Sequence, residues 1–340
     1  MGLEQAWYKR SSWLCVLRPL ELLFRWLAAR RRQRYREGLQ ASWRAPVPVI
    51  VVGNISVGGT GKSPLVIWLI EHLRQRGFKP GVISRGYRAK PPTTPYFVTS
   101  ASTAAQAGDE PLMIVRRTSV ALVISPDRVA AAQLLLEQTD CDLIISDDGL
   151  QHYALERSIE IAVIDGVRGF GNRRCLPEGP LREPVSRLRE VDLIVVNGAS
   201  PGTVLDAEYT GKAFSMTLQP GCLVSLASGN ALTADQWRSS RNVNAVAAIG
   251  NPARFSDTLT ALGFNPRLHR FPDHHHYSAN ELSFDDSLSL IMTEKDAVKC
   301  DHIALDNAWY LQVDAVLEEG FATSLQQLLG DWLAADKRAK

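Results

Sequence analysis

Cysteine is scarce in this chain of 340 residues, which has only five, all far apart. They are Cys15, Cys141, Cys175, Cys222 and Cys300. An odd number of cysteines with no C-x-x-C pair argues against a disulfide framework and against a structural zinc knuckle. We therefore expect reduced thiols and a cytosolic setting.

A hydrophobic run long enough to cross a membrane is also lacking. The best candidate, residues 13–29, would reach only about 26 Å as a helix, and it contains Arg18, Glu21 and Arg25. Each charge would cost roughly 2.5–3.5 kcal/mol at the centre of a bilayer. No small-residue cleavage site is present and the positive charges follow the apolar run, so we do not expect a secretory signal peptide either.

The net charge of +2 shows little excess of one sign, but the charges are unevenly distributed. Residues 1–46 contain ten basic and three acidic side chains, so this arm carries +7 and the remainder −5. Such an arm suits an anionic membrane surface or a nucleic acid. Its aromatic residues lie on the apolar face and do not alternate with the basic ones, so no nucleic-acid partner is expected.

The apolar residues of this arm have helical spacing. Trp13, Leu20 and Leu27 share one face, and Pro19 predicts either a kink or a helix that begins there. We expect residues 1–45 to form a basic amphipathic helix on a membrane surface, with tryptophans such as Trp7 at headgroup depth. The alternative is a helix packed on the protein's own core.

What the chain does contain is a strand followed by a glycine-rich loop. Residues 49–52 form a continuous apolar run, typical of a buried parallel strand. The loop glycines let backbone amides approach an anion. The lysine that follows them supplies a positive charge for the β- and γ-phosphates, and the next serine is a Mg²⁺ ligand. A serine replaces the first glycine of the usual pattern. The predicted ATP-binding residues are Ser56, Val57, Gly58, Gly59, Thr60, Gly61, Lys62 and Ser63.

Polar side chains also follow other apolar strands. Asp147 and Asp148 end an apolar run, as in a Walker-B strand whose carboxylate holds Mg²⁺ opposite Ser63. Arg85 follows a short strand and would either bind phosphate in the ligand crevice or lie at the surface. Asp109 follows a polar stretch predicted to be a mobile loop, residues 89–108, and is either a helix N-cap or a carboxylate delivered to the site.

Several motifs in a fixed order resemble those of a known family. They are S-V-G-G-T-G-K-S-P at 56–64, S-R-G-Y at 84–87, G-D-E-P at 108–111, D-D-G-L-Q-H at 147–152 and P-L-R-E-P at 180–184. With them the chain resembles the tetraacyldisaccharide 4′-kinases, the lipid A 4′-kinases of Gram-negative bacteria. The resemblance implies ATP and Mg²⁺ as cofactors, phosphorylation of the 4′-hydroxyl of tetraacyldisaccharide 1-phosphate to give lipid IVA, and work at the cytoplasmic face of the inner membrane.

The resemblance also implies roles for particular residues. Glu183 becomes a further metal contact, and the D-H-H run at 273–275 becomes part of the active site. We assign the catalytic base to Asp109, assisted by His274, since a carboxylate within hydrogen-bond reach is a sufficient base for a sugar hydroxyl. Which of the three adjacent histidines acts stays open. Possible substrate contacts are Arg85, Arg182 and His275.

The alternation of strands and helices predicts an α/β fold with a doubly wound, mostly parallel sheet of the P-loop NTPase type. We expect a P-loop kinase domain at 46–200, a linker or β-ribbon at 201–228 that contains two strand-like segments, and a smaller α/β domain at 229–340 that closes over the site. Another family-like motif, T-E-K-D at 293–296, has no role that the sequence explains.

A different class of function fits part of the same pattern. A membrane-associated ATPase switch with a deviant Walker loop would use its nucleotide state to recruit a protein partner, and it would need no base for an acceptor hydroxyl. For the kinase, the expected partners are the acylated disaccharide phosphate lipid and the membrane surface, and no obligate protein partner is evident.

Overall fold

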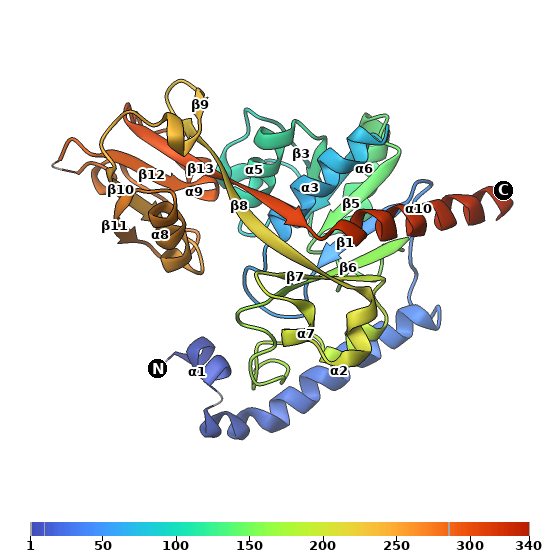
Figure 1. The fold of residues 1–340 in the computed structure, drawn as a ribbon. Coiled ribbons are helices and arrows are strands. Elements are labelled where there is room, and N and C mark those ends of the chain that lie inside the picture. The colour runs from blue at the N-terminus through green and yellow to red at the C-terminus, as the bar shows by residue number, and fades with distance from the viewer. Residues whose placement is uncertain (1, 10, 285, 340) are drawn as a thin grey trace.

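The computed structural model describes residues 2–9, 11–284 and 286–339, and one continuous sheet of thirteen strands runs through it (Figure 1). Its strand order is β11-β10-β12-β13-β8-β7-β6-β1-β5-β2-β4-β3, with β9 paired to β8. The strands are β1 Val49–Gly53, β2 Pro80–Ser84, β3 Tyr96–Val98, β4 Leu122–Ile124, β5 Leu143–Asp147, β6 Ile159–Asp165, β7 Leu193–Asn197, β8 Ala213–Ser225, β9 Ala231–Leu232, β10 Asn242–Ala247, β11 Asn265–Arg270, β12 Ser289–Thr293 and β13 Ala308–Leu317. Most neighbours are parallel, so the predicted α/β class is confirmed.

Helices cover both faces of this sheet. The α-helices are α1 Leu3–Lys9, α2 Arg18–Arg36, α3 Lys62–Gln75, α4 Ala104–Ala107, α5 Asp109–Thr118, α6 Arg128–Gln138, α7 Pro201–Val204, α8 Pro252–Ala261, α9 Glu294–Ala297 and α10 Glu319–Ala339. Short 3₁₀ helices are η1 Ser12–Leu17, η2 Val185–Arg189, η3 Ala207–Lys212, η4 Ala234–Gln236 and η5 Ala279–Glu281.

The central strand β1 is buried on both faces, as its unbroken apolar run predicts. Ile50 and Val52 pack with α3, α5 and α10 on one face, whereas Val49 and Val51 pack with α6 on the other. Strands β5 and β6 flank β1 in parallel. The carboxyl ends of these strands therefore meet at one edge of the sheet, where ligands bind in such folds.

The segment 89–108 has more structure than the predicted loop. It contains the edge strand β3, which pairs antiparallel with β4, and the helical turn α4. At three residues β3 is too short for a pattern of alternating hydrophobicity to reveal it. Tertiary pairing decides its conformation.

The two strand-like segments predicted within 201–228 are one strand. Strand β8 is 13 residues long. Its first residues pair in parallel with β7, and the rest pairs antiparallel with β13. The ribbon between the two halves of the molecule is thus formed by β8 and a strand that comes much later in the chain.

The C-terminal half is a smaller sheet with its own core. Strands β11, β10, β12 and β13 are parallel neighbours. Helix α8 packs on them through Phe255 and Leu259, next to the buried Phe264. This half has the same strand–loop–helix arrangement as the first half, but its loop before α8 contains no P-loop lysine.

The C-terminal helix α10 returns to the first half. Phe321, Leu325 and Leu329 are buried in the core that contains α3. The ring of Phe321 meets Trp68 edge-on, with centroids 5.5 Å apart. Residues after 317 therefore share a core with the nucleotide-binding half, although they were predicted as part of the 229–340 domain.

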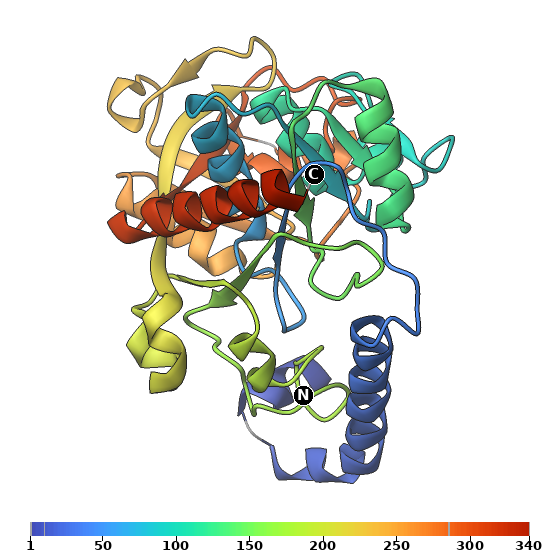
Figure 2. The same ribbon diagram turned by 90° about the vertical axis from the view of Figure 1, so that its right-hand side faces the viewer.

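The amino-terminal helices pack on the loop 166–184 and its surroundings, at the side of the molecule away from the C-terminal half (Figures 1 and 2). Helix α2 begins at Arg18 with Pro19 in its first turn, the second of the two predicted alternatives. Trp7 is buried and its indole donates to the Pro177 carbonyl at 3.0 Å, so the prediction that it lies at headgroup depth is wrong. None of the helices in the described residues is long and apolar enough to span a bilayer.

Candidate active site

The glycine-rich loop joins β1 to α3, which starts at Lys62. Gly61 has φ +94°, and a Cβ there would lie 2.5 Å from the amide nitrogen of Asn197. That amide donates to the carbonyl of Thr60 at 3.1 Å. Glycine is required at 61 both by its backbone conformation and by this close approach.

A basic loop, residues 166–184 with four arginines, lies directly against the phosphate-binding loop. The amide of Val57 donates to the carbonyl of Pro180 at 2.8 Å. Arg168 donates to the carbonyl of Gly59. Two segments that the sequence separates by more than a hundred residues thus form one surface, which is suited to an anion by its arginines and backbone amides.

Lys62 lies between two acceptors at the end of the sheet. Its Nζ is 3.3 Å from Asn54 Oδ1 and 3.4 Å from Asp148 Oδ1. Arg182 donates to both oxygens of Asp148, at 3.2 and 3.0 Å. Burial opposes ionisation, but Lys62 and Arg182 hold the pKa of Asp148 well below its usual range. Asp148 is therefore an ionised carboxylate beside the P-loop lysine.

The pKa of Asp147 shifts in the opposite direction, although Asp147 is adjacent to Asp148 in the chain. Asp147 is buried, its Oδ2 accepts from Ser84 Oγ at 3.1 Å, and its Oδ1 has no partner in the described part of the chain. Burial, together with the charge of Glu110, raises the pKa of Asp147 to about 6. A cation at the free oxygen would satisfy it and favour the ionised form.

These residues fit Mg²⁺ together with a nucleotide. Within the described ranges no three His, Cys, Asp or Glu side chains are grouped so that they could hold a metal alone. Mg²⁺ in nucleotide sites usually takes one or two carboxylates, with phosphate oxygens and water as further ligands. The unpaired oxygen of Asp147, the ionised Asp148 and the Ser63 hydroxyl at the start of α3 match that pattern.

Glu183 lies in the same region, but both of its carboxylate oxygens are engaged. Oε2 accepts from Gln151 Nε2 at 2.8 Å, and Oε1 accepts from the Tyr153 hydroxyl. The guanidinium of Arg187 is 3.8 Å away. A metal contact by Glu183, as the resemblance implies, would require one of these partners to move.

Asp109 meets His274 across the two halves of the molecule. His274 Nδ1 lies 2.9 Å from Asp109 Oδ2, and both side chains are largely buried. Gly108, with φ +85°, is the N-cap of α5, so the interpretation of Asp109 as a capping residue is wrong. His275 instead contacts Glu281 of its own loop at 3.0 Å. Of these two neighbouring histidines, His274 is the one that the fold brings to Asp109.

This pair lies beside the phosphate-binding loop. Desolvation opposes the ionisation of the next residue, Glu110, but Lys295 and then Lys62 lower its pKa. Glu110 in turn helps to raise the pKa of Asp147. A carboxylate–imidazole pair, the P-loop lysine and the candidate metal acids therefore share one electrostatic environment.

The three residues predicted to contact the substrate have different surroundings in the structure. Arg182 binds Asp148 directly. Arg85 is exposed where β2 ends, and His275 faces Glu281. Roles for Arg85 and His275 in substrate binding stay predictions.

Three polar side chains escaped the sequence analysis. Asn54 binds Lys62, Asn197 supports the loop at Thr60, and Gln151 links Glu183 to the Asn54 carbonyl at 3.2 Å. Each lies at the carboxyl end of a buried strand or within a few residues after it. Their position at the carboxyl end of a strand was the available signal, since parallel strands end at a common edge.

A mostly parallel sheet whose central strand enters a glycine-rich loop, with a lysine and two aspartates at that edge, defines a P-loop nucleotide-binding protein. The family model for tetraacyldisaccharide-1-P 4′-kinase matches residues 13–330. The chain therefore belongs to the tetraacyldisaccharide 4′-kinase family, and the predicted resemblance is confirmed.

Named relatives agree along nearly the whole chain. A tetraacyldisaccharide 4′-kinase of Pseudomonas entomophila is 53% identical over 317 residues, covering 93% of this chain and 92% of the relative. That of Stutzerimonas stutzeri is 52% identical over 333 residues, covering 97% and 98%. A crystal structure of LpxK from Aquifex aeolicus in complex with ATP has a TM-score of 0.80 and 28% identity, covering 93% of this chain and 99% of the other.

Proposed function

We propose that this protein transfers the γ-phosphoryl group of ATP to the 4′-hydroxyl of tetraacyldisaccharide 1-phosphate, forming lipid IVA and ADP. The observation that carries the proposal is the Asp109–His274 pair, 2.9 Å apart, beside the P-loop. A nucleotide switch has no need of a base placed for an acceptor, whereas a kinase for a sugar hydroxyl does.

Different residues of the chain hold the phosphates and the metal ion of the nucleotide. Backbone amides from Ser56 to Gly61 surround the phosphates, and Lys62 turns from Asp148 and Asn54 to the β- and γ-phosphates. Asp147, Asp148 and Ser63 would hold Mg²⁺, with Glu183 as a further contact. The metal would neutralise charge that develops on the phosphoryl oxygens.

The acceptor proton goes to Asp109. The 4′-oxygen attacks the γ-phosphorus as its O–H proton passes to the Asp109 carboxylate, and the bond from phosphorus to the β-phosphate oxygen breaks to release ADP. His274 orients Asp109 through the contact at Nδ1. Because Asp109 comes from one half and His274 from the other, a closed molecule completes the pair and excludes water.

Contact with the lipid is proposed for helix α2. The side of the helix that faces the protein is mixed in polarity. Glu21 is buried and lies 3.3 Å from the Cys175 amide, Arg32 pairs with Glu190, and Phe24 packs against the core. The apolar side of the helix is exposed at residues such as Leu20, Leu23 and Leu27. An amphipathic helix with this orientation and a basic C-terminal end suits an anionic bilayer, which supports the proposed location at the cytoplasmic face of the inner membrane.

The test is a transfer assay with the whole chain in detergent. The protein is incubated with γ-labelled ATP, Mg²⁺ and tetraacyldisaccharide 1-phosphate, and label is measured in the lipid and in free phosphate. We expect labelled lipid from the wild type, none from Lys62→Ala, and about 10²–10⁴-fold less from Asp109→Ala, which should still bind ATP.

Label in free phosphate alone, with the lipid unmodified, would refute the kinase. If Asp109→Ala then kept full ATPase activity, the ATP-dependent switch that recruits a protein partner would be the better account.

A further inference from the structure

The T-E-K-D motif at 293–296 lies where β12 ends and is firmly anchored in the C-terminal half. Thr293 Oγ1 donates to Asp296 Oδ2 at 2.6 Å. Asp296 is fully buried, accepts from the Ala248 amide at 3.0 Å and lies 2.6 Å from the ammonium of Lys299. The first and last residues of the motif therefore fix it in place.

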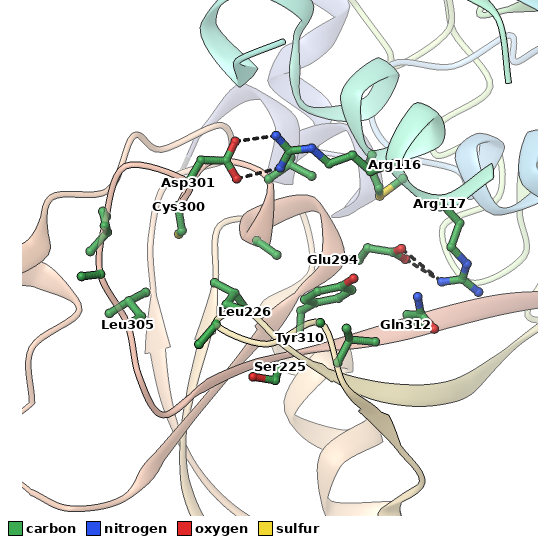
Figure 3. A pocket seen from close by; sticks show the side chains of 18 of the residues that line it. Arg116, Arg117, Ser225, Leu226, Glu294, Cys300, Asp301, Leu305, Tyr310 and Gln312 are labelled. Atoms are coloured by element: carbon green, nitrogen blue, oxygen red, sulfur yellow. Dashed lines mark hydrogen bonds and ion pairs between the residues drawn. The ribbon is translucent and has the colours of Figure 1, made fainter. Parts of the chain in front are cut away.

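The two middle residues reach across to α5 in the nucleotide-binding half. Glu294 accepts from Arg117 near the C-terminal end of α5, at 3.1 and 3.0 Å (Figure 3). Lys295 Nζ donates to Glu110 Oε1 in the first turn of the same helix, at 3.1 Å. The motif thus holds both ends of the helix whose first residue is Asp109.

Lys295 also contacts the other side of the catalytic pair. Its Nζ is 3.6 Å from Asp273 Oδ1, and Asp273 Oδ2 is 3.7 Å from His274 Nε2. Asp109 and Glu110 are adjacent in the chain, as are Asp273 and His274. One ammonium therefore links the sequence neighbours of both members of the pair and closes a ring of five side chains.

The backbone of His274 gives a reason for this link. Its φ is +63°, a conformation that residues other than glycine rarely adopt. Such a conformation persists only when its surroundings hold it. The contact between Lys295 and Asp273 supplies one such restraint at the residue immediately before His274.

We propose that Lys295 is a positioning residue for phosphoryl transfer, which aligns His274 with Asp109 by bridging Glu110 and Asp273. This inference rests on the proposed function. Lys295 itself touches neither substrate nor nucleotide in this role, and it acts through the pair. The T-E-K-D motif is then the part of the C-terminal half that sets the catalytic geometry as the halves meet.

A matched control comes from another ion pair between α5 and the C-terminal half. Arg116 of α5 binds Asp301 with two hydrogen bonds, at 2.7 and 2.6 Å, and also joins the halves (Figure 3). It lies at the end of α5 far from Asp109. Loss of this pair weakens closure in general but leaves the ring around His274 intact.

The experiment compares Lys295→Met, Lys295→Arg and Arg116→Gln in the transfer assay, with ATP and lipid each varied up to saturation. Since a misplacement of about 1 Å can lower a rate about 100-fold, we expect kcat to fall about 30- to 100-fold in Lys295→Met while both KM values stay within about threefold. Lys295→Arg should recover most of kcat, and Arg116→Gln should change it by less than about threefold.

A double-variant test keeps the proposal falsifiable if Lys295→Met is poorly folded by its melting temperature. Asp273→Asn removes the other end of the same bridge and should lower kcat on its own. The combination with Lys295→Gln should then lose no more than Asp273→Asn alone, since either change breaks the same bridge. Any of three results would overturn the positioning role. They are losses of kcat that multiply in the double variant, an unchanged kcat in Lys295→Met, and an equal loss of kcat in Arg116→Gln. A wild type that leaves the lipid unlabelled would refute the proposed function instead.

Discussion

Two neighbouring carboxylates at the end of β5 differ sharply in their environments. Asp148 is held ionised by Lys62 and Arg182, despite its burial. Asp147 is buried near Glu110, keeps one oxygen without a hydrogen-bond partner among the described residues, and has its pKa raised to about 6. The adjacent positions alternate across the strand end, so one faces the basic loop and the other faces the interior. A cation at the free oxygen of Asp147, as in the proposed Mg²⁺ site, would favour the ionised carboxylate.

This difference predicts how stability depends on pH in the metal-free protein. The pKa of Asp147 rises from 3.8 to about 6 on folding, so the folded state binds more protons between these values. The free energy of unfolding therefore falls as the pH rises through this window, by up to about 3 kcal/mol. Asp147→Asn should remove that loss, and urea unfolding in EDTA at pH 4.5 and pH 8 measures it.

The control for this prediction is Mg²⁺ with ATP. Together they should stabilise the wild type at pH 8 and stabilise Asp147→Asn much less. A variant with the same pH dependence as the wild type would show that Asp147 is not the titrating group.

At the scale of elements, α2 shows that an amphipathic pattern does not tell which face points inward. The helix places Glu21 against the protein and leaves apolar side chains at the surface. Arg18 and Glu178 pair beside it, so polar contacts attach it to the loop that covers the P-loop. A contiguous exposed apolar face of this kind marks a surface for binding a membrane or a protein.

Vesicle binding tests the role of this face. Leu20, Leu23 and Leu27 are 55%, 52% and 52% exposed, so replacing all three with serine removes about 3 kcal/mol of apolar burial in a bilayer, about 100-fold in partitioning. We expect the variant to stop sedimenting with anionic vesicles at an unchanged melting temperature. Leu14→Ser, at a buried position of η1, should instead lower the melting temperature. Unaltered sedimentation of the triple variant would contradict the anchoring role.

Helix α10 follows the C-terminal half in the sequence, but its buried side chains stabilise the core of the nucleotide-binding half. Phe321 is fully buried and contacts Trp68 and Phe214. Phe321→Ala should lower the free energy of unfolding by about 3–5 kcal/mol, because it leaves a cavity next to α3. Urea unfolding measures this loss, and Gln326→Ala, a half-buried position on the same helix, should have a much smaller effect. Equal effects of the two substitutions would show that α10 does not contribute to this core.

At the scale of the whole molecule, one sheet and one returning helix join the two halves. Strand β8 pairs with β7 at one end and with β13 at the other, and α10 then packs on the first half. The nucleotide-binding half completes its core with residues from the end of the chain, and its sheet continues through β8 into the C-terminal half. Four residues of α5, namely Asp109, Glu110, Arg116 and Arg117, also make side-chain contacts across the interface and can adjust the site.

This connectivity predicts a single cooperative unfolding transition, unlike a protein with independent domains. Hydrogen exchange followed by mass spectrometry in increasing urea should show β1 and β10 losing protection at the same concentration. ATP with Mg²⁺ should shift both equally, because ligand binding stabilises the whole cooperative unit. Loss of protection in β10 at clearly lower urea would show that the halves unfold separately.

The sequence alone determined three features of this protein. They are the phosphate-binding loop, the strands that lead to Arg85 and Asp147, and membership of the family. Their signals are local: glycines where the backbone must turn, apolar runs of strand length, and polar residues directly after them. Short-range sterics and burial determine these features over a few neighbouring residues.

Tertiary structure alone decided the contacts between distant residues. His274 meets Asp109 across 165 positions, Lys295 meets Glu110 across 185, and β8 finds β13 as its partner. It also decided that Glu21 of α2 points inward and that α10 returns to α3. These outcomes depend on the path of the whole chain and on which surfaces remain to be buried, so no pattern within a short segment could specify them.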